Sequence, residues 1–220
     1  MLTLGIDDAG RGPVIGPMVL AGCLIDDKVS EELKKLGVKD SKQLTQKRRE
    51  FLAKIIKEKA ETFEVVVLHP DEIDKKMGKI NLNDLEAIAT ARIINKINKG
   101  FNKIRVVVDC PSVSIIKWTD LLKTKINNLS NLDVSCEHKA DQNHIAVSAA
   151  SVLAKTVREI EMDKLREKYG PEIGSGYTSD PSTQKFLEKY AKKYKDSGIF
   201  RQSWITWKNA VSISSQRKLI

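Results

Sequence analysis

The sequence is poor in the residues that stabilise small secreted domains or zinc modules. Its three cysteines, Cys23, Cys110 and Cys136, are widely spaced, and none forms a Cys-x-x-Cys pattern. Their odd number and their apolar, strand-like surroundings exclude a disulfide framework. We therefore expect reduced, buried thiols, as in cytosolic proteins.

Long apolar runs are also missing. No stretch reaches the roughly 20 apolar residues that a membrane-spanning helix needs. The N-terminus begins with a strand-like segment instead of a basic and then apolar signal sequence. The sequence therefore predicts a cytoplasmic protein without membrane association, and we expect a monomer.

Negative charge is in deficit, with 29 Asp and Glu against 38 Lys and Arg, a formal net charge of +9 at pH 7. This balance favours polyanionic partners but also occurs in ordinary soluble proteins. The 220 residues are enough for one hydrophobic core with a small appendage.

Strand-like and helix-like segments alternate along the chain. Short apolar runs predict strands, and segments with one apolar face predict helices. The predicted strands are Leu2–Ile6, Val14–Ile25, Phe63–Leu68, Ile104–Val108 and Leu132–Cys136, and the predicted helices are Thr45–Lys59, Leu82–Asn98, Asn143–Lys168, Pro181–Lys195 and Trp204–Val211. Strands separated by helices imply an α/β core, a mixed sheet with helices on both faces.

Aspartates follow the apolar strands. Asp7 and Asp109 each close a strand, and Asp141 stands where a loop gives way to the long helix. Ligands gather at the carboxyl ends of strands in α/β sheets. Clustered carboxylates there would repel one another unless their pKa values shift or they share a cation. Asp8 could join them if the chain turns directly after Asp7, and Ala9–Gly12 supplies a turn.

Oxygen ligands without nearby His or Cys clusters select Mg²⁺ or Mn²⁺ over zinc. Two such ions can activate water and stabilise the leaving oxygen of a phosphate, so the acids predict metal-assisted phosphodiester hydrolysis. The alternative is that each aspartate merely caps a turn or a helix. We expect His69, His138 and His144 either to be structural or to support the groups that contact the metals, because metal-activated water needs no histidine base.

Several motifs in a fixed order resemble the type 2 ribonuclease H family, particularly its archaeal form, across almost the whole chain. The matching blocks are Gly5–Met18, Asp40–Leu44, Val108–Asp109, His138–Asp141, Val147–Lys155, Gly174–Tyr177, Asp180–Pro181 and Arg201–Trp204. The resemblance implies a ribonuclease H-like mixed five-stranded sheet flanked by helices. Residues 1–170 would form this catalytic domain, and residues 171–220 a small C-terminal helical segment that binds substrate.

The resemblance also implies the site residues. Asp7, Asp8, Asp109 and Asp141 would be both catalytic and metal-binding, with two Mg²⁺ or Mn²⁺ ions per site during catalysis. The substrate-binding residues would be Gly10, Arg11 and Gly12 at the ribose 2′-hydroxyl, Tyr177 on the sugar, Lys42 and Lys155 on phosphates, and Ser151 through its hydroxyl. Glycines permit close backbone approach, and the 2′-hydroxyl distinguishes RNA from DNA.

Simpler interpretations exist for several of these residues. A tyrosine beside glycines often covers core, a serine on an apolar helix often serves packing, and a Gly-Arg-Gly turn can be only a turn. Trp204 and Trp207 could stack on nucleic acid, but their spacing on a helix favours anchoring of the C-terminal segment.

The implied activity is that of an endonuclease with RNA/DNA hybrids and ribonucleotide-containing duplex DNA as partners. It would use water as the nucleophile, cut 5′ of embedded ribonucleotides, leave 5′-phosphate and 3′-hydroxyl ends, and serve DNA replication and repair. The family has Glu at the position of Asp8, and the missing methylene shortens the reach by more than about 1 Å. A catalytically impaired, hybrid-binding form is therefore the alternative. A transposase or junction resolvase is disfavoured, because its DNA would not need the Gly-Arg-Gly loop.

Overall fold

The computed structural model describes residues 1–38 and 44–216, with residues 213–216 described by their backbone alone. The chain forms two compact units. The first contains Met1–Ala9, Val19–Val66 and Leu82–Val157, and the second contains Gly10–Met18, Val67–Asn81 and Arg158–Ile220. Each unit combines segments that are distant in sequence, and the expected division at residue 170 stays a prediction.

Five strands form a single mixed sheet in the order β3-β2-β1-β4-β5. Its central strand β1 is antiparallel to β2 and parallel to β4, which is itself parallel to β5. This topology confirms the α/β fold class predicted from the sequence. The strands are β1 (Leu2–Ala9), β2 (Met18–Asp26), β3 (Thr62–Leu68), β4 (Ile104–Asp109) and β5 (Leu132–Glu137).

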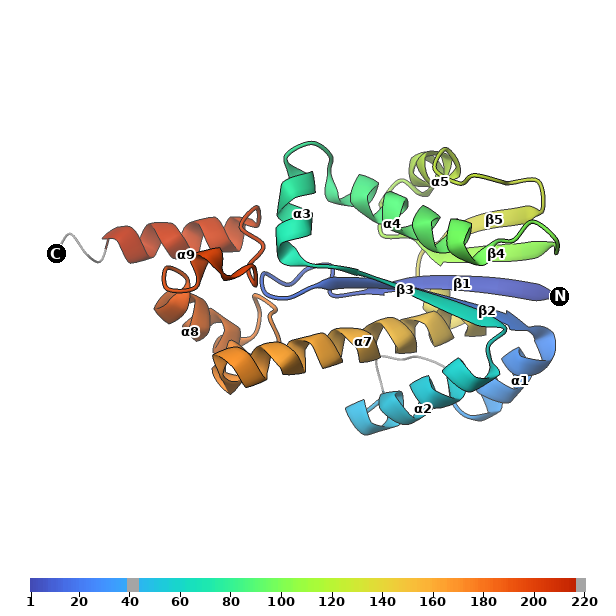
Figure 1. The fold of residues 1–220 in the computed structure, drawn as a ribbon, viewed down its shortest axis with the longest axis horizontal. Helices are drawn as coiled ribbons and strands as arrows, with labels where there is room; N and C mark the ends of the chain where they lie inside the picture. Colours follow the sequence, from blue (N-terminus) through green and yellow to red (C-terminus); the bar gives the residue numbers. More distant parts are fainter. Residues whose placement is uncertain (39–43, 217–220) are drawn as a thin grey trace. The chain divides into compact units, whose positions relative to one another are not determined.

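Helices cover both faces of the sheet in the first unit (Figure 1). They are α1 (Asp27–Lys35), α2 (Gln46–Lys59), α4 (Leu82–Ile97), α5 (Ile115–Lys123), α6 (Ala140–Asn143) and α7 (Ile145–Tyr169). Two strand glycines lie directly beneath helices. A Cβ atom added to Gly5 would lie 2.1 Å from the carbonyl carbon of Ala146 in α7, and one added to Gly22 would lie 2.4 Å from Ile93 in α4. These close approaches fix α7 and α4 on opposite faces of β1 and β2.

The second unit has its own hydrophobic core around Phe186 and Phe200. The ring centroids of Phe200 and Trp207 are 4.3 Å apart, which confirms Trp207 as an anchor of the C-terminal segment. The elements of this unit, besides the end of α7, are α3 (Pro70–Met77), η2 (Pro171–Ile173), α8 (Pro181–Tyr190), η3 (Lys195–Ser197) and α9 (Ile205–Gln216).

Four expectations need correction. Strand β1 continues to Ala9, so the chain does not turn directly after Asp7. Strand β2 begins at Met18 instead of Val14, because Gly16 has a positive φ of 86° that interrupts an extended path. Helix α8 ends at Tyr190, well before Lys195. The long helix predicted from residue 143 divides at His144, whose extended backbone separates α6 from α7.

The structure also bears on the cysteines and on membrane-spanning segments. Cys23, Cys110 and Cys136 are buried free thiols, as predicted. Burial raises the pKa of Cys23 to about 12, which makes this thiol unreactive at neutral pH. Within residues 1–38 and 44–216, no helix combines the length and apolar character needed to span a membrane.

Candidate active site

Acidic residues of the first unit lie at the carboxyl ends of β1 and β4. The parallel register pairs Ile6 with Val108, so Asp7 and Asp109 are the next residues on two neighbouring strands. Asp7 is only 7% exposed and follows the buried residues Leu4, Gly5 and Ile6 of the same strand. Asp7, Asp8 and Asp109 line one small cavity of about 10 Å³. The acids of β1 therefore share one site even though the chain does not turn between them.

The pKa of Asp7 is strongly perturbed in this cavity. Burial raises its pKa to about 8, and the negative charges of Asp8 and Asp109 add to the shift. Two hydrogen bonds act in the opposite direction: the Asp8 amide donates to Asp7 Oδ1 over 2.7 Å, and the Ser151 hydroxyl bonds the same carboxyl. The ionised form is thus disfavoured unless a positive charge approaches.

Asp141 is held beside this site by the backbone. The amide of Ala140 donates to Asp109 Oδ1 over 3.1 Å, which fixes the first turn of α6 at the end of β4. Lys139, with a left-handed φ of 57°, makes the turn into α6. Asp141 follows Ala140 and is buried, and the Ser148 hydroxyl donates to its carbonyl.

Sequence reasoning missed one acid. Glu86 of α4 is only 1% exposed and lines the same cavity as Asp7, Asp8 and Asp109. Its signal in the sequence is an acid between two apolar helix residues, Leu85 and Ala87, both of which are buried. A charged side chain at such a position is rare without a partner or a function.

The donor set suits a hard divalent cation, because carboxylate oxygens are the ligands that Mg²⁺ and Mn²⁺ prefer. In the part of the chain that the structure describes, no three His, Cys, Asp or Glu side chains come close enough together to hold an ion. The observation that fits a cation is the buried Asp7 carboxyl with Asp8 and Asp109 lining the same cavity, because a positive charge there would offset their mutual repulsion and favour the ionised form of Asp7.

The loop that follows β1 belongs to the second unit, and Arg201 organises it. The Arg201 side chain is 0% exposed and makes four hydrogen bonds of 2.6–3.1 Å to the carbonyls of Gly10, Arg11 and Gly16. The Trp204 indole adds a bond of 3.2 Å to the carbonyl of Gly12. A planar guanidinium suits this task, because its donors are fixed in a fork. The carbonyls of the loop thus face Arg201 and Trp204.

The segment around Tyr177 pairs with the same loop. The carbonyl of Gly176 accepts the amides of Val14 and Ile15 at 2.9 and 3.3 Å. The amide and hydroxyl of Ser175 each donate to Asp180 over 2.7 Å, and they hold the pKa of Asp180 at about 2. Tyr177 itself remains 39% exposed. This tyrosine is not a core residue, contrary to the simpler interpretation of its sequence.

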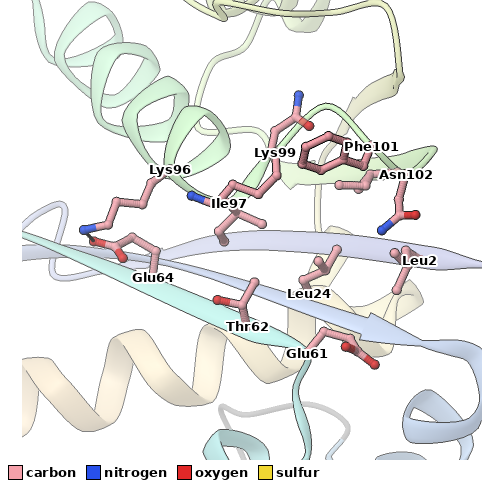
Figure 2. Close-up of a pocket in the computed structure, with 12 residues that line it drawn as sticks. Leu2, Leu24, Glu61, Thr62, Glu64, Lys96, Ile97, Lys99, Phe101 and Asn102 are labelled. Carbon is pink, nitrogen blue, oxygen red and sulfur yellow. Dashed lines mark ion pairs between the residues drawn. The ribbon is translucent and has the colours of Figure 1, made fainter.

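A larger cavity of about 380 Å³ lies elsewhere in the first unit (Figure 2). Leu2 and Ile104, at the start of β1 and β4, line it, and Lys96 and Glu64 form an ion pair of 3.5 Å at its wall. None of the predicted site residues that the structure describes lines this cavity. The acids at the opposite ends of the strands, not the larger volume, therefore define the candidate site.

Comparison with known proteins agrees with this arrangement. The family model described as Ribonuclease HII matches residues 4–207. The Ribonuclease HII of Methanocaldococcus jannaschii is 44% identical over 230 residues, which cover 100% of this chain and 99% of that protein. The chain belongs to the ribonuclease HII family. It is therefore an endoribonuclease, and its resemblance to type 2 ribonuclease H is confirmed.

Two solved members of the ribonuclease HII family share the fold. The crystal structure of ribonuclease H2 from Pyrococcus horikoshii has a TM-score of 0.85 and 38% identity, and the match covers 99% of each chain. The ribonuclease HII of Archaeoglobus fulgidus, solved in complex with PCNA, has a TM-score of 0.80 and 37% identity over 91% of this chain and 92% of its own.

The remaining candidate residues of this ribonuclease HII chain are placed as follows. Ser151 is fully buried in α7, and Lys155 is half-buried one helical turn later. Lys42 lies outside the described residues. His144 Nε2 lies 3.0 Å from Glu137 Oε2, and His138 Nδ1 lies 3.3 Å from the carbonyl of Cys110. These contacts agree with structural roles for both histidines.

Proposed function

We propose that this chain hydrolyses the RNA strand of RNA/DNA hybrids and cuts 5′ of ribonucleotides embedded in duplex DNA. The observation that carries the proposal is the buried Asp7 carboxyl, flanked by Asp8 and Asp109 at the ends of two parallel strands of a ribonuclease HII fold. Such paired acids suit phosphodiester hydrolysis by water, with 5′-phosphate and 3′-hydroxyl products.

Asp7, Asp8, Asp109 and Asp141 would hold Mg²⁺ or Mn²⁺, and two bound ions would supply an activated water and stabilise the leaving oxygen. The chain itself orients these ligands. The Asp8 amide and the Ser151 hydroxyl fix Asp7, and the Ala140 amide fixes Asp109. Ser151 thus contributes through Asp7, in keeping with its complete burial.

Selection of RNA over DNA is assigned to the backbone of Gly10, Arg11 and Gly12 together with Tyr177. Arg201 holds the carbonyls of Gly10 and Arg11 on one side, which leaves the loop fixed before substrate arrives. A preformed loop loses little conformational freedom when it binds a sugar. Tyr177 offers an exposed ring for stacking on that sugar.

Binding to the backbone of the duplex is assigned to cationic side chains. Lys155 on α7 and Lys42 would each neutralise a phosphate, and the net charge of +9 would attract the duplex from a distance. We expect affinity to fall steeply with salt, because phosphate contacts release counterions.

The decisive assay uses an end-labelled DNA duplex that contains one ribonucleotide. We expect metal-dependent cleavage on the 5′ side of that residue, no cleavage in EDTA, and no cleavage of the matched all-DNA duplex. Cleavage of plain DNA at a comparable rate would place the chain with the resolvases. Products ending in a 2′,3′-cyclic phosphate would show that the 2′-hydroxyl, not water, is the nucleophile. Neither the fold nor the relatives support the alternative of a hybrid-binding form without activity.

A further inference from the structure

Arg158 is a buried cation that the proposed function does not use. It lies in the part of α7 that belongs to the second unit, and it is 7% exposed. Burial lowers its pKa, so its charged form is not fully compensated where it lies. Such a residue is costly to keep in a folded protein unless it has a task.

The guanidinium of Arg158 touches two elements assigned to the sugar. Its Cζ lies 5.0 Å from the centre of the Tyr177 ring, within the range of a cation–π contact. A Cβ atom added to Gly10 would lie 2.2 Å from Nε and 2.4 Å from Cδ of Arg158. Only a glycine allows this packing, and Gly10 also has a positive φ of 80°. Arg158 therefore lies against Gly10 and against Tyr177.

One nitrogen of the Arg158 guanidinium is held by a hydrogen bond, and another has no partner in the described residues. Its Nη2 donates to the carbonyl of Ser175 over 2.9 Å, two residues before Tyr177. Its Nε is buried and has no hydrogen-bond partner in the described residues. A buried donor without a partner requires an explanation, and a functional role is one of the few that apply.

We propose that Arg158 is a positioning residue for ribose recognition, whose guanidinium holds the Tyr177 ring and the Gly10 backbone in one arrangement so that both reach the same sugar. This inference rests on the proposed sugar-reading role of Gly10 and Tyr177. The ring lies on the guanidinium while the residue as a whole stays 39% exposed, so the cation supports Tyr177 without burying it. Loss of the support would leave the duplex bound through its phosphates but the sugar misplaced.

The test compares Arg158→Met, Arg158→Lys and the matched control Arg166→Met. Arg166 lies eight residues further along α7 and forms an ion pair of 2.8 Å with Glu159, so the control removes the same charge from the same helix. We expect Arg158→Met to lower kcat about tenfold, because misplacement of a reacting group affects the chemical step, and to raise KM by no more than the factor by which the binding preference for the ribonucleotide falls. Arg158→Lys should recover part of the rate, because an ammonium retains the cation–π contact. Arg166→Met should change kcat less than about twofold.

A second readout needs no cleavage. Fluorescence anisotropy in EDTA measures affinity for the ribonucleotide-containing duplex relative to the all-DNA duplex. We expect the wild-type preference to fall towards equality in Arg158→Met and to persist in Arg166→Met. If Arg158 acts through the ring, Tyr177→Ala should lower kcat by a clearly smaller factor in the Arg158→Met protein than in the wild type.

The possible outcomes distinguish a failure of this inference from a failure of the proposed function on which it rests. A wild-type protein that neither prefers nor cuts the ribonucleotide duplex would overturn the proposed function. If the wild type does both, while Arg158→Met behaves like Arg166→Met or its effect multiplies with that of Tyr177→Ala, only the role of Arg158 is wrong. If Arg158→Met fails to fold, Arg158→Lys is compared in two backgrounds instead. Any loss of binding preference that it causes in the wild-type protein must be absent when it is introduced into the Tyr177→Ala protein; a loss in both backgrounds would show that Arg158 does not act through the ring.

Discussion

Asp7 allows stability and catalysis to be separated in one variant. We expect Asp7→Asn to abolish cleavage and, at the same time, to stabilise the metal-free protein at neutral pH. Burial and the charges of Asp8 and Asp109 raise the pKa of Asp7 from 3.8 to about 8. At pH 7 the folded chain therefore keeps a proton on this carboxyl that the unfolded chain releases, and this difference opposes folding.

The size of the effect follows from the interval between 3.8 and pH 7. At about 1.4 kcal/mol per pKa unit, the upper limit is about 4 kcal/mol. Relaxation and water entry reduce such desolvation costs, so we expect a measured gain of about 1–2 kcal/mol. An asparagine does not ionise, and its oxygen can still accept the Asp8 amide, now 2.7 Å from Asp7 Oδ1.

The electrostatic account also predicts in which direction the free energy of unfolding changes with pH. Because the folded pKa is raised, the stabilising contribution of Asp7 is full below about pH 4 and is lost as the pH rises towards 8. Urea unfolding in EDTA at pH 5 and 7.5, followed by circular dichroism, measures this slope. Asp71→Asn is the control, because Asp71 lies on the surface in an exposed ion pair with Lys75. An Asp7→Asn protein with the wild-type slope would refute the electrostatic account, and substantial residual cutting would refute the assigned role.

Three further changes test other parts of the molecule. We expect Asp8→Glu to raise the cleavage rate in Mg²⁺ by up to about 10²-fold, or to relax a need for Mn²⁺, because the longer side chain reaches the metal better. Equal or slower rates in both metals would show that the shorter carboxylate of Asp8 is well accommodated. Arg201→Lys cannot make four hydrogen bonds to three carbonyls, so urea unfolding should show a loss of about 3 kcal/mol or more; a loss below about 1 kcal/mol would contradict the proposed organisation of the loop. Gly5→Ala places a Cβ 2.1 Å from the Ala146 backbone. The free energy of unfolding, measured by the same urea assay, should fall by about 3 kcal/mol. Wild-type stability of this variant would mean that α7 does not lie this close to β1.

Local patterns predicted the central strands and the acids that follow them. The run Val106–Val108 is β-branched and buried, as a strand covered on both faces requires. Asp109 comes directly after it, so its place at the end of β4 could be read from the sequence. The assignment of Asp7, Asp8, Asp109 and Asp141 as metal ligands stays a prediction.

Short helices were harder to predict. Helices α1, α3 and α5 were missed, although Asp26 caps α1 and Pro70 stands in the first turn of α3. In α1 the only buried residue is Leu33. A helix with such a small apolar face gives almost no periodic signal, so its capping residues are the only local indication.

Two contacts between distant segments were not predicted from the sequence. Arg201 appeared in the sequence only as part of a motif, and its partners lie 185–191 positions away. Glu86 enters the acidic cavity from α4, and no pattern near it indicates Asp7. Both are consequences of tertiary packing, which a single sequence does not reveal without related sequences.

The distance along the chain between Gly10 and Arg201 also bears on synthesis. The two residues are 191 positions apart. At about 5–20 residues per second, a ribosome adds Arg201 roughly 10–40 s after Gly10. During that interval the nascent chain already carries Asp7 and Asp8, but the guanidinium that shapes the neighbouring loop does not yet exist. A product that terminates between residues 141 and 201 would keep all four acids but lack the Arg201 guanidinium that orders the sugar-reading loop. The proposed selectivity for RNA is therefore acquired only after Arg201 has been added to the chain.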